Sequence, residues 1–252
     1  MSERRARGAR RSARAPSQHF IRSRGLAAEL VRDAGVQPYE LVLDLGAGSG
    51  RLTSELARAA DRVIAVELDR RWADYLRGRW PNVDVLHDDA AAVPLPSEPF
   101  RVVANVPFDR TTAILRHLLD DPRIPLERAD VIVEWGVALK RAIPWPSTLN
   151  GVLWGAWYSC AITRRLPRHA FDPPPSVDAG VLAFERRFDP LVPETEWRRY
   201  RRFVATGFRH GLRTAAPART LRELRVARAT PRELDAHEWA ALFAACRPEV
   251  RG

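Results

Sequence analysis

The chain has 252 residues, of which 46% are apolar and 29% are charged, and this balance supports a folded core and excludes disorder throughout. Its formal net charge is +10, and Lys140 is the only lysine, so arginine carries nearly all the positive charge. Arginine binds phosphate through paired hydrogen bonds and stacks on bases. The excess of positive charge therefore indicates a polyanionic partner, most often nucleic acid.

The distribution of apolar residues and cysteines excludes several classes of protein. No run of about 18 apolar residues occurs, so no membrane-spanning helix is expected, and the basic N-terminus lacks the apolar stretch of a secretory signal. Cys160 and Cys246 show no metal-ligand spacing, so free thiols and no metal site are expected. These features predict a cytoplasmic protein.

The first segment, residues 1–16, is rich in arginine and holds hardly any large apolar group. Such a segment cannot offset its loss of entropy by burial, so a flexible basic arm is expected. Two interpretations stay open: the arm binds phosphates, or it is a solvated tail without a role.

From residue 25 onward, apolar residues alternate between helical and strand spacing. The spacing predicts helices near 26–35, 52–60, 72–76 and 111–119, and strands near 40–45, 62–67, 83–86, 101–104, 131–133 and 180–185. This alternation predicts an α/β domain over residues 17–188, with a mainly parallel sheet, helices on both faces and the last strand closing the sheet. Residues 189–252 repeat apolar side chains at helical spacing among many arginines, so a small helical domain is expected there.

A glycine-rich turn follows the first central strand, where residues 41–50 read LVLDLGAGSG. Gly46, Gly48 and Gly50 let the backbone turn sharply and approach a ligand at a helix N-terminus. NAD-binding folds use a similar loop with different glycine spacing. Asp44 at the strand end suits a ligand with positive charge, such as the sulfonium and ammonium of S-adenosylmethionine, rather than a pyrophosphate.

Two further acids stand at the ends of the next strands. Glu67 lies 23 residues after Asp44, where a carboxylate can accept hydrogen bonds from both ribose hydroxyls. Asp89 follows the third strand, where it can accept a hydrogen bond from an adenine amino group. Each acid alone is typical of a solvated loop, but three at consecutive strand ends predict a nucleoside cofactor. S-adenosylmethionine is favoured over NAD.

The fourth strand ends in the tetrapeptide Asn105-Val106-Pro107-Phe108. An adenine amino group is a poor nucleophile because its lone pair is delocalised into the ring. The Asn105 side-chain oxygen and the Val106 carbonyl are predicted to accept hydrogen bonds from that amino group and so free the lone pair. Pro107 would fix the turn, and Phe108 would stack on an extruded base. The alternative interpretation is a turn with a buried phenylalanine.

Taken together, residues 17 to about 213 resemble the rRNA adenine N6-methyltransferases of the Erm and KsgA group. The matching segments are SQHFI at 17–21, NVPF at 105–108, WGVALKR at 135–141 and FDPPPSVD at 171–178. The resemblance implies a Rossmann-like class I S-adenosylmethionine methyltransferase, α/β in class, with a small C-terminal helical domain that binds RNA.

The resemblance also implies roles for individual residues. Residues 105–108 would be catalytic, and Phe108 and Phe171 would contact the target adenine. The expected cofactor contacts are Gln18, His19, Ile21, Gly46, Gly48, Glu67, Asp89 and Asn105. Three positions depart from the family pattern: His19 replaces an asparagine, Glu134 stands where glutamine is common, and Gly136 stands where glutamate is common.

The function implied is S-adenosylmethionine-dependent N6-methylation of a specific adenosine in 23S rRNA, conferring macrolide–lincosamide–streptogramin B resistance. The expected enzyme is a monomer that acts on protein-free rRNA or an early assembly intermediate. The Erm branch is favoured because Asp44-Leu-Gly-Ala-Gly replaces the E-x-G-P-G of the KsgA branch. Two alternatives stay open: a 16S rRNA adenine dimethyltransferase of ribosome biogenesis, and a non-catalytic RNA-binding protein of the same fold.

Overall fold

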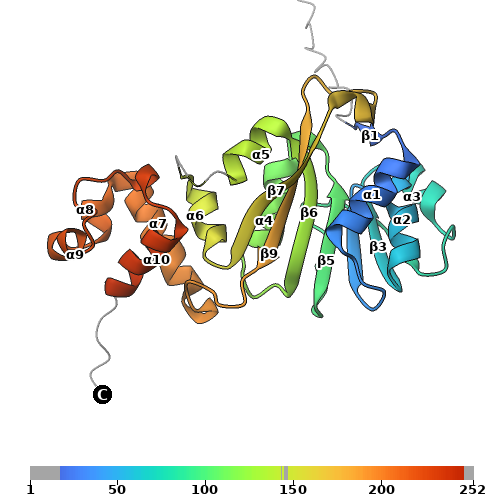
Figure 1. The fold of residues 1–252 in the computed structure, drawn as a ribbon. Coiled ribbons are helices and arrows are strands. Elements are labelled where there is room, and N and C mark those ends of the chain that lie inside the picture. Colours follow the sequence, from blue (N-terminus) through green and yellow to red (C-terminus); the bar gives the residue numbers. More distant parts are fainter. Residues whose placement is uncertain (1–17, 143, 145–146, 247–252) are drawn as a thin grey trace, which may run out of the picture.

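A computed structural model of the protein describes residues 18–142, 144 and 147–246 (Figure 1). The expected basic arm over residues 1–16 lies outside the described residues. The strands are β1 (Phe20–Ile21), β2 (Leu41–Leu45), β3 (Arg62–Glu67), β4 (Val83–His87), β5 (Phe100–Asn105), β6 (Leu126–Glu134), β7 (Tyr158–Leu166), β8 (Phe171–Asp172) and β9 (Ala179–Arg186). The α-helices are α1 (Arg24–Ala34), α2 (Arg51–Ala59), α3 (Arg70–Leu76), α4 (Thr111–Leu119), α5 (Trp135–Ala142), α6 (Leu149–Gly155), α7 (Trp197–His210), α8 (Leu212–Ala215), α9 (Ala218–Glu223) and α10 (Ala236–Ala245).

Seven strands form one sheet in the order β4-β3-β2-β5-β6-β9-β7. The first five strands in this order, β4, β3, β2, β5 and β6, are parallel to one another. Strand β9 is antiparallel to both of its neighbours, β6 and β7. The α/β alternation expected from the sequence is therefore observed. The order reverses between β2 and β5, and in open parallel sheets ligands bind outside the carboxyl ends of strands at such a point.

The expectation that the last strand closes the sheet is wrong. β9 lies between β6 and β7, and β7 forms the edge. The sequence did not reveal β7 because its side chains alternate between exposed and half-buried positions and include two consecutive arginines, Arg164 and Arg165. An edge strand with one solvated face carries too few apolar residues to stand out.

Helices cover both faces of the sheet because successive strand residues point in opposite directions. In β2, Leu41, Leu43 and Leu45 pack in one apolar cluster with α4, whereas Val42 packs in another with α1 and α2. Helix α1 begins where the Ser23 side chain accepts a hydrogen bond from the Leu26 amide. None of the helices within the described ranges is long and apolar enough to cross a lipid bilayer.

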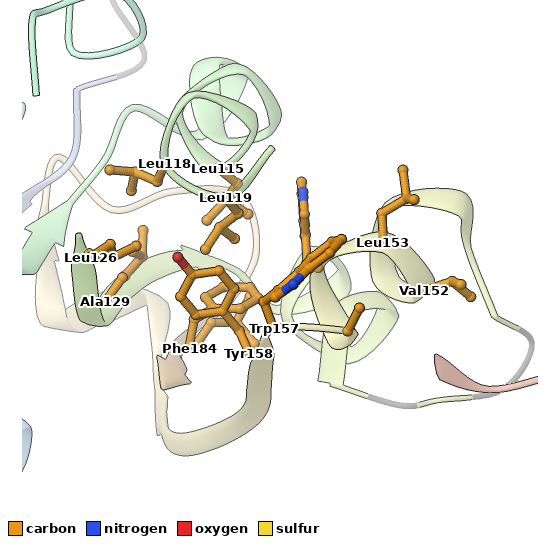
Figure 2. Close-up of a cluster of buried hydrophobic side chains, with 14 of the residues drawn as sticks. Leu115, Leu118, Leu119, Leu126, Ala129, Val152, Leu153, Trp157, Tyr158 and Phe184 are labelled. Carbon is orange, nitrogen blue, oxygen red and sulfur yellow. The ribbon is translucent and has the colours of Figure 1, made fainter. Parts of the chain in front are cut away.

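Of the C-terminal helices, α7 and α10 pack on α6 at the far side of the sheet from α1 (Figure 1). Trp157 contacts Tyr200 edge to face, and the same apolar cluster continues into α10 at Phe243. Figure 2 shows Trp157, Tyr158 and Phe184 within this cluster. Trp154, Trp157 and Phe184 are all buried in this core. The sheet and the C-terminal helices thus share one continuous core.

Candidate active site

A cavity of about 320 Å³ opens at the carboxyl ends of the central strands. Its position at the reversal between β2 and β5 is where this topology places ligands. Its walls come from the glycine-rich turn, the ends of β3 and β5, and the segment before β1. The lining residues are Gln18, His19, Phe20, Gly46, Gly48, Val66, Glu67, Leu68, Asp89, Ala90, Asn105, Pro107, Asp109, Arg110 and Ile114.

The glycine-rich turn is held against β3 and covered by the N-terminal segment. The amides of Gly46 and Ala47 both donate hydrogen bonds to the Val66 carbonyl, at 2.8 and 3.0 Å. Gly48 has a φ of 51°, and a Cβ there would lie 2.5 Å from a ring carbon of Phe20. Any larger residue at 48 would therefore displace the Phe20 ring from the cavity wall.

Asp44 lies behind the turn and does not line the cavity. It is 1% exposed, and the Thr53 hydroxyl donates a 2.6 Å hydrogen bond to its Oδ2. Burial raises the pKa of Asp44 to about 7, the Thr53 hydrogen bond opposes this rise, and the charge of Glu67 adds to it. The predicted attraction between Asp44 and a positive ligand would therefore act through the turn rather than by direct contact.

Glu67 is buried at the end of β3 and lines the cavity. Its Oε2 accepts a 2.7 Å hydrogen bond from the Gly48 amide, and its Oε1 accepts one of 2.8 Å from the Asp69 amide. Each carboxylate oxygen can accept a second hydrogen bond. Glu67 therefore orders the glycine-rich turn and still offers acceptors to a ribose.

Asp89 and Arg110 form an ion pair at the mouth of the cavity. Asp89 Oδ1 also accepts a 2.9 Å hydrogen bond from the Ala91 amide. This backbone hydrogen bond, followed by the contact with Arg110, lowers the pKa of Asp89 and keeps it ionised. Arg110 lies two residues beyond the tetrapeptide and binds one oxygen of the carboxylate that was predicted to accept from an adenine amino group.

Asn105 ends β5 with its amide fixed in one orientation. Its Nδ2 donates a 2.7 Å hydrogen bond to the backbone carbonyl of His19, which leaves Oδ1 buried with no hydrogen-bond partner among the described residues. A buried acceptor without a donor costs roughly 1–3 kcal/mol. A bound molecule that donates an N–H to this oxygen would remove that cost.

The segment before α1 is tied to the turn at 171–178 from the other end of the domain. β1 and β8 pair antiparallel, Phe20 with Asp172 and Ile21 with Phe171. The His19 ring donates from Nδ1 to the Pro173 carbonyl at 2.8 Å, and its centroid lies 5.5 Å from that of Phe108. Two of the segments that carry the family resemblance therefore meet beside the tetrapeptide.

Most of the residues assigned from the sequence come together at the cavity. Eight of them line it: Gln18, His19, Gly46, Gly48, Glu67, Asp89, Asn105 and Pro107. Four do not: Ile21, Val106 and Phe171 are buried in the core, and Phe108 is half-buried against the rings of His19 and Phe171. Phe171 thus supports Phe108 from behind and is not itself open to a base in this structure.

Several lining residues were not anticipated. Leu68 follows Glu67 directly and is 63% exposed on the cavity wall, and the others are Phe20, Val66, Ala90, Asp109, Arg110 and Ile114. Leu68 could have been found from the sequence because it directly follows Glu67, a predicted cofactor contact. Phe20 had the same signal, since it stands between the expected contacts His19 and Ile21, whereas Arg110 gave none, because it reaches the cavity through its ion pair with Asp89.

The lining of the cavity suits the chemistry of S-adenosylmethionine. An apolar wall with Leu68 and Ile114 faces carboxylates at the ends of neighbouring strands, which fits a ligand with an adenine, a ribose and positive charge. The described part of the chain holds no group of three His, Cys, Asp or Glu placed to bind a metal ion.

Known proteins share these features. The family model described as "Ribosomal RNA adenine dimethylase" matches residues 11–215. The mycinamicin-resistance protein MyrB of Micromonospora griseorubida is 37% identical over 243 residues, covering 90% of this chain and 76% of the relative. An rRNA adenine N-6-methyltransferase of Bacillus licheniformis is 32% identical over 175 residues, covering 68% of this chain. The match spans only 61% of that relative's length.

Solved structures agree with the sequence relatives. The 23S rRNA methyltransferase ErmE superposes with a TM-score of 0.76 and 28% identity, covering 90% of this chain and 98% of ErmE. A dimethyladenosine transferase from Plasmodium falciparum, at 18% identity and a TM-score of 0.74, shares the fold. The predicted fold class and the predicted cofactor of the family are confirmed. The chain belongs to the ribosomal RNA adenine dimethylase family, with similarity to its Erm-type methyltransferases.

Proposed function

We propose that this protein transfers a methyl group from S-adenosylmethionine to N6 of one adenosine in 23S rRNA. The observation that carries the proposal is the Asn105 amide oxygen, an acceptor without a partner among the described residues at the edge of the cavity. Its orientation is set by the hydrogen bond from Nδ2 to the His19 carbonyl.

The residues of the tetrapeptide provide the chemistry that an adenine amino group requires. Asn105 Oδ1 accepts a hydrogen bond from one N–H and the Val106 carbonyl accepts from the other, which favours a pyramidal nitrogen with its lone pair available. Phe108, held between His19 and Phe171, stacks on the extruded base. S-adenosylmethionine supplies an electrophilic methyl group on a sulfonium. No general base is needed, because the methylated amino group loses its extra proton to water.

The cofactor is held by the residues that line the cavity. Glu67 would accept hydrogen bonds from the ribose, and the Asp89 carboxylate, which also pairs with Arg110, would accept one from the cofactor's adenine. Gly46, Gly48, Gln18 and His19 would hold the methionine part of the ligand. Ile21 supports this cover from the core.

The choice of 23S rRNA is supported by two relatives. MyrB is named for mycinamicin resistance, and ErmE is titled a 23S rRNA methyltransferase. We therefore propose that methylation protects the ribosome against macrolide, lincosamide and streptogramin B antibiotics. A second candidate is the 16S rRNA, since a small-subunit methyltransferase A from Shouchella clausii is 33% identical over 190 residues.

We further propose that the enzyme is a cytoplasmic monomer that acts on protein-free 23S rRNA or an early assembly intermediate. The division into a methyltransferase domain over 17–188 and an RNA-binding helical domain over 189–252 is part of this proposal. The arginine-rich sequence of the C-terminal segment supports it. Light scattering of the protein with and without rRNA tests whether the protein is a monomer.

The deciding experiment offers tritiated S-adenosylmethionine with protein-free 23S and 16S rRNA in parallel, followed by primer extension. Label at one adenosine of 23S rRNA is the expected result, with macrolide resistance when the gene is expressed in a sensitive host. Label near the 3′ end of 16S rRNA would instead show that the protein is a 16S rRNA methyltransferase of ribosome biogenesis. Absence of label in both, with cofactor bound, would overturn the proposal.

A further inference from the structure

Two sets of ring contacts, joined by the chain neighbours His19 and Phe20, lead from the tetrapeptide to α3. The rings of Phe108 and His19 lie 5.5 Å apart, and the next residue, Phe20, lies 5.4 Å from Trp72. Trp72 in turn lies 5.6 Å from Tyr75. Tyr75 is 46% exposed, so these contacts end at the solvent.

At that end lies a second cavity of about 380 Å³ between α2 and α3, here called the α2–α3 groove. Trp72, Tyr75 and Trp80 line it on one side, and Arg51 and Arg79 line it with them. It shares no lining residue with the cofactor cavity, although Ser49 and Gly50 of the glycine-rich turn reach it. The proposed cofactor contacts therefore leave the groove unused.

The groove carries an excess of positive charge. Two of its arginines, Arg24 and Arg58, are paired with the single carboxylate of Glu55. Within the described ranges, neither Arg51 nor Arg79 forms an ion pair. Four guanidinium groups thus face one carboxylate, which is the balance expected of a surface that binds phosphates.

Arg79 is placed to extend the stacking surface. Its guanidinium lies 3.5 Å from the centroid of the Tyr75 ring, and its Nε donates a 2.6 Å hydrogen bond to the Tyr75 carbonyl. A planar guanidinium held against an aromatic ring offers its other face to a base. The first turn of α2 adds partial positive charge beside it, because Gly50 provides no side-chain cap.

We infer that the α2–α3 groove binds single-stranded RNA that flanks the target adenosine. Bases stack on Trp72, Tyr75 and the Arg79 guanidinium, and phosphates bind Arg51 and Arg79. The inference rests on the proposed function in taking the flanking RNA as part of the same substrate. A duplex does not fit this surface, since its bases are already stacked on one another and closed to the rings.

The test compares groove variants with a control variant in the first turn of α3. Tyr75→Ala, Arg79→Ala and Arg79→Lys alter the groove, whereas Arg70→Ala removes the same charge from α3 at an exposed residue outside it. Fluorescence anisotropy measures binding of a labelled single-stranded oligouridylate and of an RNA duplex to the full-length protein. Calorimetry measures S-adenosylmethionine binding, which all four variants should keep.

The expected result is at least a fivefold loss of oligouridylate affinity, about 1 kcal/mol per lost stacking contact, in Tyr75→Ala and Arg79→Ala. Arg79→Lys should recover only part of this loss, because lysine keeps the charge but has no planar face. The affinity of the groove variants for the RNA duplex should match the duplex affinity of Arg70→Ala. The Michaelis constant for 23S rRNA should rise in the same groove variants with kcat little changed.

Three results would overturn the inference: oligouridylate affinities equal to that of Arg70→Ala, equal losses for oligouridylate and duplex, or lost cofactor binding. Failure of the proposed function is distinct from these. If the wild-type protein methylates neither rRNA but its oligouridylate affinity still depends on Tyr75 and Arg79, the groove is an RNA site and the proposed substrate is wrong. If rRNA is methylated with an unchanged Michaelis constant in the variants, the function holds and the groove is not part of it.

Discussion

The side-chain amide of Asn105 donates a hydrogen bond to the backbone carbonyl of His19. This contact fixes the side chain through Nδ2 and leaves the Asn105 Oδ1 for a ligand. Because the acceptor is a backbone atom, the side chain at position 19 is not needed for it. The histidine at position 19, where the family resemblance implies an asparagine, is therefore compatible with this orientation of Asn105.

We expect Asn105→Ala to lower kcat by about 10²–10³, the usual effect of removing one preorganised hydrogen-bonding group from a transition state. His19→Ala keeps the backbone carbonyl, so its effect on kcat should be at least tenfold smaller. Methylation of a 23S rRNA fragment at saturating cofactor gives both values. Equal losses in the two variants would contradict a separate role for the amide oxygen.

Phe108→Ala should leave cofactor affinity unchanged and sharply reduce turnover, because Phe108 does not line the cofactor cavity. Stacking on a base contributes about 1–3 kcal/mol, so we expect at least a fivefold loss in kcat/KM for RNA. Phe108→Tyr keeps the ring and serves as the control. A variant with Leu at 108 that matched Tyr would show that packing against Phe171, rather than stacking, is what matters.

Asp44 makes the stability of the fold depend on pH. The pKa of Asp44 rises from 3.8 to about 7 on folding because the carboxyl is buried. A raised acid pKa means that the unfolded chain loses this proton first, so stability falls as pH rises from 3.8 to about 7, and the loss is complete above that.

Asp44→Asn removes this titration while keeping an acceptor for the Thr53 hydroxyl. Urea unfolding at about pH 5 and about pH 8 should show a free energy of unfolding that falls more steeply in the wild type, by about 3 kcal/mol. Parallel pH profiles for the two proteins would mean that Asp44 ionises normally in the fold.

Two glycines in helices should respond oppositely to alanine. A Cβ at Gly207 in α7 would lie 2.3 Å from Cη2 of Trp239, so Gly207→Ala should destabilise the protein by about 1–3 kcal/mol. A Cβ at Gly136 in α5 would have no described atom within 4 Å beyond its own helix backbone and chain neighbours, so Gly136→Ala should stabilise by up to about 1 kcal/mol. Thermal unfolding of both variants measures the pair. Stabilisation by Gly207→Ala would disprove the close packing of α7 on α10.

The central half of the fold could be predicted from sequence because its elements follow simple periodicities. β3 and α4 begin and end as expected, since buried strands and amphipathic helices carry their own pattern. β1 and β8 could not be predicted, because each has two residues and exists only through pairing with the other. Their pairing is tertiary and leaves no local signal.

The site was predicted to the same extent. The sequence could predict the site positions of Glu67, Asp89 and Asn105, because strand ends in a parallel sheet share one edge. Position along the chain therefore predicts proximity. The ion pair of Arg110 with Asp89 was not, because it joins a loop to a helical turn across the cavity. Asp44 shows the limit of residue type alone, since its carboxylate points into the interior and binds Thr53.

The hydrogen bond from the His19 ring to the Pro173 carbonyl joins positions 154 residues apart in the chain. Contacts of such long range form late, since the ends of the loop must first meet. During synthesis the glycine-rich turn and the tetrapeptide leave the ribosome long before the turn at 171–178. That turn holds the N-terminal segment over the cavity. A ribosome that makes this protein therefore completes the reactive site only after about two thirds of the chain has emerged, and nascent fragments shorter than that should bind neither cofactor nor RNA in a productive way.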